Sequence, residues 1–137
     1  MAFTGQESID LFLGRVLHTL LGRHGAEQIF LFGPAGEPFW CARPPLTSDD
    51  LRTLQQALGL IERLEAERPK PFIGHDPGGR FSVAALGRDS DLHVVCVHDG
   101  VDAAVAEARV VQVRDALEPR VANVRNGRER SATGYRL

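Results

Sequence analysis

The sequence predicts one α+β domain in which a helix, a two-stranded hairpin, a second helix, three strands and a last helix follow one another. Apolar residues recur every three or four positions in three long segments, which is the pattern of amphipathic helices. Five short segments rich in apolar residues lie between them and are bounded by glycine and proline, as strands are. The length of 137 residues is typical of a single domain.

Local signals support the individual elements. Thr4 and Glu7 have the spacing of a capping box before the first helix, and Thr47 is expected to cap the second. Segments 27–32 and 92–98 are apolar on both alternating faces, which predicts central strands of a sheet covered on both sides. The expected elements are helices over about residues 5–22, 47–67 and 102–117, and strands over 27–32, 38–42, 71–74, 80–86 and 92–98.

The chain is expected to end in a polar tail. Pro119 should stop the last helix because proline lacks the N–H that the helical hydrogen bond needs. Glycine and polar residues dominate the segment after it. We therefore expect one domain over residues 1–120 and a mobile C-terminal tail over 121–137.

Charge and composition weigh against nucleic-acid and membrane partners. The net charge is −2 and the pI is about 6.2, so the chain lacks the strong positive field that holds nucleic acid or an anionic membrane. Apolar runs are far shorter than the roughly 20 residues that span a bilayer, and the first residues lack the pattern of a signal peptide. We expect a cytoplasmic protein. Fifteen arginines beside one lysine, Lys70, suggest a GC-rich, bacterial genome.

No segment has the pattern of a catalytic, cofactor or metal site. Cys96 and His98 would share a strand face and could bind zinc with a third ligand, but no matching ligand motif is present. His75 and Asp76 precede a proline and fit a turn better than a catalytic pair. The glycine-rich turn at 33–36 leads into a strand, so it lacks the helix N-terminus that binds phosphate. We expect no catalytic residue, cofactor or metal.

The second helix carries more apolar surface than one core contact needs. Its apolar residues form two adjacent stripes that cover about half of its circumference, against the roughly 100° of a typical amphipathic helix. One stripe would pack on the sheet, and the other would be free to contact a partner. Together with the short strand at 71–74, these stripes predict a dimer or partner interface formed by Leu51, Leu54, Leu58, Ile61, Phe72 and Ile73.

The order of elements resembles that of the roadblock / dynein light-chain family, a branch of the profilin-like folds. The resemblance covers about residues 6–120 and includes the hairpin segment GAEQIFLFGPAGEPFWCA at residues 25–42. It implies the order α-β-β-α-β-β-β-α and a five-stranded antiparallel sheet with helices on both faces, the second helix alone on one of them. It also implies a dimer across the second helix and the third strand, and a non-enzymatic role as adaptor or regulator of a small Ras-like GTPase.

Two other functional classes share this combination of helices and sheet. A small-molecule sensor of the GAF or PAS type would need a roomy pocket with convergent polar groups, for which Trp40, Phe72 and His93 are candidate lining residues. A dimeric secretion chaperone usually has a stronger acidic bias than a net charge of −2. An enzyme is the class least supported by the residues.

Overall fold

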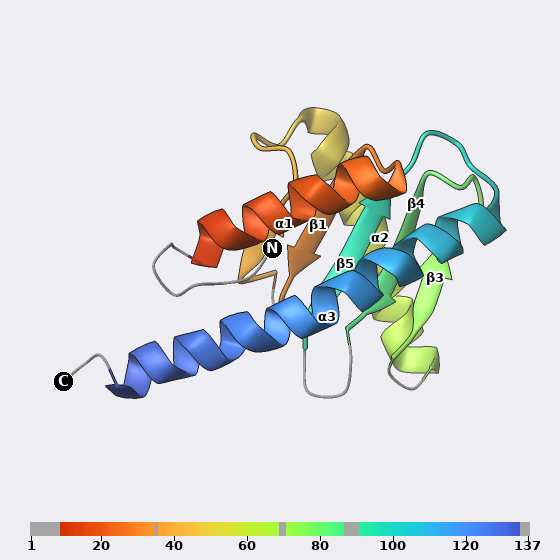
Figure 1. Ribbon diagram of the computed structural model, residues 1–137. Helices are drawn as coiled ribbons and strands as arrows, with labels where there is room; N and C mark the ends of the chain where they lie inside the picture. The colour runs from red at the N-terminus through yellow and green to blue at the C-terminus, as the bar shows by residue number, and fades with distance from the viewer. Residues whose placement is uncertain (1–8, 35, 69–70, 87–90, 135–137) are drawn as a thin grey trace.

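The computed structural model describes residues 9–34, 36–68, 71–86 and 91–134, with side chains described up to residue 121. It shows an α+β fold with a five-stranded antiparallel sheet in the order β2-β1-β5-β4-β3 (Figure 1). The elements are α1 (Ile9–His24), β1 (Gln28–Phe32), β2 (Phe39–Cys41), α2 (Ser48–Glu67), β3 (Ile73–His75), β4 (Phe81–Ala85), β5 (His93–Val97) and α3 (Ala103–Gly134).

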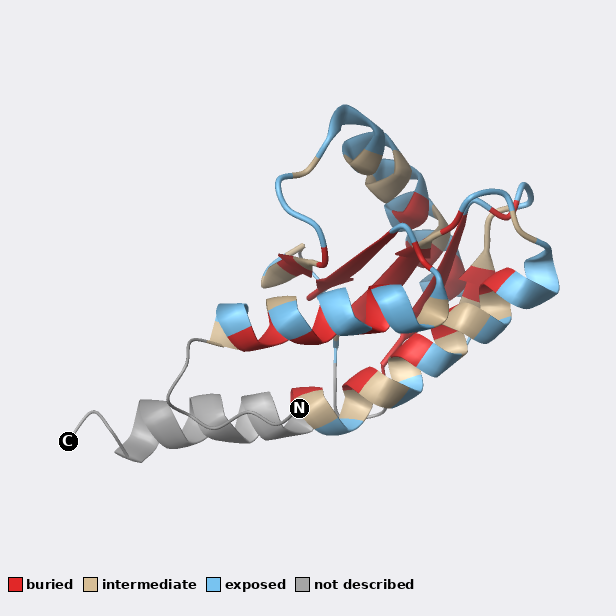
Figure 2. Cartoon of the chain, turned by 45° about the horizontal axis from the view of Figure 1, so that its top comes forward, coloured by how far each residue is buried: buried red, intermediate tan, exposed pale blue. Residues whose placement is uncertain are grey.

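The sheet has an apolar core on each face. Alternate residues of β1 point to opposite sides: Ile29 and Leu31 join a cluster with α1 and α3, and Phe30 and Phe32 join a cluster with α2. All five residues of β1 are buried (Figure 2). The prediction of central strands covered on both sides is therefore confirmed, and so is the placement of helices on both faces.

A buried glutamine joins the start of α2 to the sheet. Gln28 is 4% exposed, and its side-chain amide accepts from the Arg43 N–H at 2.9 Å and donates to the Arg43 carbonyl at 2.9 Å. The Asp50 side chain lies 3.4 Å from the same amide nitrogen and also accepts from the N–H of Thr47, which caps α2 as predicted. These bonds hold the chain between β2 and α2 against β1.

The third strand and the last helix differ most clearly from the sequence prediction. The third strand covers Ile73–His75 instead of 71–74. The last helix does not end at Pro119 but continues through it to Gly134. Pro119 is exposed, and Val121 is 7% exposed in the same apolar cluster as Leu117, so packing on both sides of the proline outweighs one lost hydrogen bond.

Two further predictions fall at least partly outside the described residues. The capping box of Thr4 and Glu7 lies wholly outside them. In the predicted tail, 121–137, the helix of residues 121–134 is described, whereas the side chains beyond residue 121 are not. The mobility of the tail stays a prediction.

The buried His98 makes stability depend on pH. Its Nε2 lies 2.8 Å from Ser82 Oγ, and burial followed by the charge of Arg109 lowers the pKa of its imidazole to about 4. The folded state thus binds fewer protons than the unfolded state between the folded pKa and the ordinary value of 6.5. We expect the free energy of unfolding contributed by this group to fall by on the order of 3 kcal/mol as the pH drops through that range, at about 1.4 kcal/mol per pKa unit.

Urea unfolding measures this loss when it is carried out at neutral pH and again at a pH close to the lowered pKa of His98. The His98→Gln variant keeps a hydrogen-bonding partner for Ser82 but cannot titrate, so it should lose less stability on acidification than the unsubstituted chain. Equal losses in the two proteins would contradict the role of His98.

Candidate protein-interaction surfaces

The second helix leaves two leucines exposed to solvent. Its buried residues, Ala57, Ile61 and Leu64, pack on the phenylalanines of the sheet. Leu51 is 51% exposed and Leu58 is 41% exposed, whereas Leu54 is half-buried at the margin of the core. We call Leu51, Leu54 and Leu58 the leucine surface. No other described part of the chain covers Leu51 and Leu58.

The leucine surface lies on the flank of α2 that faces away from β3. Gln56 and Leu58 are two positions apart on the helix and therefore point about 200° apart. The guanidinium of Arg80, at the start of β4, donates to Gln56 Oε1 at 3.2 Å. Glu65, one heptad after Leu58, binds Nε2 of His93 at the start of β5 at 2.9 Å. One flank therefore faces the β3–β4 hairpin, and the leucine flank faces β5 and β1.

The six residues predicted as an interface do not form one surface. Ile61 and Phe72 are 5% and 2% exposed and belong to the core between α2 and the sheet, so their assignment as contact residues is corrected. Ile73 is half-buried and packs on the opposite core, with α3. The apolar periodicity of the sequence could not tell core residues from surface residues here. It shows neither the angle at which α2 crosses the sheet nor the shift of β3 along the chain.

The second surface is the open edge of β3. Ala85 N–H donates to the Phe72 carbonyl, and Asp76 N–H donates to the Phe81 carbonyl. Because bonded residues alternate along an antiparallel ladder, the N–H and C=O groups of Ile73 and His75 point outward. Arg68 Nη1 donates to the Ile73 carbonyl at 3.2 Å and so shields one of these groups. A shallow depression of about 640 Å³ lies beside the edge, and its lining residues are Arg68, residues 71–73, and Ala104, Glu107, Ala108 and Val111 of α3.

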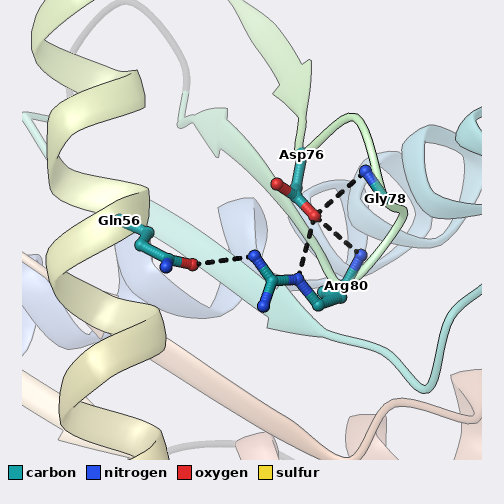
Figure 3. A network of polar contacts seen from close by, with 4 residues as sticks. All are labelled: Gln56, Asp76, Gly78 and Arg80. Carbon is teal, nitrogen blue, oxygen red and sulfur yellow. Dashed lines mark hydrogen bonds and ion pairs between the residues drawn. The ribbon is translucent and has the colours of Figure 1, made fainter.

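A polar network joins the β3–β4 turn to α2 (Figure 3). The Asp76 carboxylate accepts from the N–H groups of Gly78 and Arg80 and from Nε of Arg80, at 3.2 to 3.3 Å. Arg80 in turn reaches Gln56. On the same flank, a Cβ atom at Gly74 would lie 2.6 Å from Leu64 Cδ1, so the glycine allows α2 to pack closely on β3. Close packing and the network together set the position of α2 relative to the β3 edge.

Several polar and titratable side chains of the described residues are buried or bonded within the fold. Burial raises the pKa of the Cys96 thiol to about 12 and, together with the charge of Asp50, raises that of Cys41. Ser82 is fully buried against His98, and Asp76 stabilises a turn, as the sequence predicted. Among the described residues, no group of three or more His, Cys, Asp or Glu side chains is arranged to hold a metal ion.

Replacing Asp76 by alanine should loosen the β3–β4 turn. The Asp76 side chain is only 13% exposed, and its loss leaves two turn N–H groups and Nε of Arg80 without their acceptor. We expect a loss of about 1–2 kcal/mol in the free energy of unfolding, measured by urea denaturation. Asp49→Ala is the matched control, because that carboxylate is 88% exposed beside Arg52 and should contribute less than about 1 kcal/mol. Equal losses in the two variants would contradict the network.

No helix of the described residues is both long enough and apolar enough to cross a membrane. No protein-family model and no curated protein matches the chain, so the roadblock resemblance continues to depend on the order of elements and the pattern of residues.

Proposed function

We propose that this chain is a non-enzymatic, cytoplasmic interaction module that forms a homodimer and acts as an adaptor or regulator of a small Ras-like GTPase in a bacterium. The exposed leucine surface on α2 carries the proposal, since Leu51 and Leu58 lie two turns apart on one helix at 51% and 41% exposure and form a continuous apolar surface with the half-buried Leu54 between them. The open β3 edge provides a separate surface for the second copy. The two surfaces allow one chain to bind two partners at once.

The dimer contact fits the backbone of β3. Ile73 and His75 offer outward N–H and C=O groups on either side of Gly74. An antiparallel pair of β3 strands around a twofold axis would place Gly74 opposite the partner's Gly74. Ile73 and His75 would then exchange four hydrogen bonds with the second copy. Arg68 leaves the Ile73 carbonyl in this arrangement, which costs little because its side chain is exposed.

The leucine surface is then left for the GTPase. It faces away from the β3 edge, so dimer formation leaves it accessible. Apolar side chains in the centre of a contact with polar neighbours around them are the usual anatomy of a protein interface. The GTPase itself is taken from the roadblock resemblance, and the leucine surface supports a protein partner without naming it.

Replacing Ile73 by proline should produce a monomer. Its N–H points away from β4, so proline removes an intermolecular donor while leaving the β3–β4 ladder intact. Size-exclusion chromatography with light scattering at micromolar concentration should show a dimer for the unsubstituted chain and for Ile73→Val, and a monomer for Ile73→Pro. Circular dichroism checks that all three are folded. A monomeric unsubstituted chain, or a dimeric Ile73→Pro variant, would contradict the β3 dimer.

Replacing Leu58 by glutamate should remove GTPase binding without affecting the fold. The side chain is 41% exposed, so we expect a change of less than about 1 kcal/mol in the free energy of unfolding and an unchanged dimer. Binding to purified small Ras-like GTPases of the host, loaded with GDP or a GTP analogue, should weaken at least about tenfold. Arg63→Gln changes the net charge equally on the opposite flank and should bind normally. A GTPase that binds both variants alike would overturn this role of the leucine surface.

A further inference from the structure

Two charged side chains of opposite sign lie at opposite ends of the β3 edge. Nη1 of Arg68 donates to the Ile73 carbonyl at 3.2 Å, so the guanidinium lies at the start of β3. Nδ1 of His75 lies 3.0 Å from Oε1 of Glu107, so this carboxylate lies at the end of the strand. Both charged residues line the depression where β3 runs beside α3 (Figure 1). The open edge is therefore positive at one end and negative at the other.

Both charges are accessible to a molecule that adds to this edge. Arg68 is exposed and bonded to a neutral carbonyl, and it takes part in none of the ion pairs found among the described residues. The Glu107 side chain is 44% exposed, and its contact with His75 occupies one of its two carboxylate oxygens. A neutral imidazole that donates this bond leaves the charge of the carboxylate in place. Asp76 differs, because its side chain is 13% exposed and accepts hydrogen bonds within its own turn.

The backbone of β3 allows three antiparallel registers between two copies of the chain. Ile73 and His75 turn their N–H and C=O groups outward, so a twofold axis can pass beside Ile73, Gly74 or His75. An axis beside Ile73 brings two copies of Arg68 together, and an axis beside His75 brings two copies of Glu107 together. The axis beside Gly74 instead places Arg68 of each copy next to Glu107 of the other. Charge thus selects the register centred on Gly74.

The side chains can meet in that register. Residues directly opposite each other in an antiparallel pair point to the same face of the sheet, with Cβ atoms about 4.5–5.5 Å apart. His75 of one copy would lie opposite Ile73 of the other, on the face that α3 covers, and Glu107 lies beside His75. Arg68 already lies at the Ile73 carbonyl, so it needs only a change of rotamer to reach this carboxylate.

We propose that Arg68 of each copy forms an ion pair with Glu107 of the other. The two symmetric pairs fix the register of the β3 dimer and restrict its partner to a chain with the same arrangement of charges. This inference rests on the β3 homodimer of the proposed function and identifies what makes that contact specific.

Reversing either charge should weaken self-association. Arg68→Glu places two carboxylates together at both symmetric contacts, and Glu107→Arg places two guanidinium groups together there. We expect the dissociation constant of each homodimer to rise at least about tenfold, because attraction becomes repulsion at two sites. Sedimentation velocity at low ionic strength and about pH 8, where histidines are generally neutral, measures it. Arg52→Glu is the matched control, since it makes the same charge change at the other end of α2, where the side chain is 70% exposed.

Mixing the variants separates a charge effect from a folding defect. An equimolar mixture of Arg68→Glu and Glu107→Arg has opposite charges at both contacts, so native mass spectrometry should show a heterodimer in place of the two monomers. The double variant Arg68→Glu/Glu107→Arg should form a homodimer again. It should not pair with the unsubstituted chain, because that combination places like charges together at both contacts. A misfolded variant would not recover in these mixtures.

Three results would refute the ion pairs. They are a single variant that dimerises as tightly as the unsubstituted chain, a mixture that yields no heterodimer, and a double variant that pairs with the unsubstituted chain as readily as with itself. In each case the β3 dimer still stands if Ile73→Pro is monomeric. A monomeric unsubstituted chain would instead refute the dimer, and this inference with it.

Discussion

Burial of β1 and β5 on both faces is the constraint on which the rest of the structure depends. A strand that is apolar on both faces cannot leave either face in water, so the sheet needs helices on both sides. α1 and α3 share one face, whereas α2 covers the other face alone (Figure 2). The position of α2 therefore decides which apolar residues on that side are core and which are surface.

The position of α2 is set by contacts at both of its ends and at its middle. Gln28 and Asp50 hold its start over β1, and Arg68 caps its end beside β3. Between them, Gln56 binds Arg80 on one flank and Glu65 binds His93 on the other. This diagonal path turns Leu51 and Leu58 away from the β3 edge. The surface proposed for a protein partner and the edge proposed for a second copy are separate because of it.

The two edges of the sheet differ in their surroundings. The β3 edge has outward groups on both sides of a glycine, with Ala104, Glu107 and Ala108 of α3 beside it. The β2 edge is closed at one end by the bonds between Gln28 and Arg43 and is flanked by a groove against α1. The two open strands of the sheet therefore differ in the side chains around them.

Local signals in the sequence determined the α+β class, the order of the elements, the Thr47 cap and the two-sided burial of β1, because each depends on residues close together in the chain. The wide apolar surface of α2 was also visible in the periodicity. Tertiary structure alone decided that Ile61 and Phe72 are core, that Ile73 packs with α3, and that Leu58 faces away from β3, because each depends on how a helix crosses a sheet. It also decided that α3 continues through Pro119, since the packing of Leu117 and Val121 on distant residues outweighs a local helix-breaking signal.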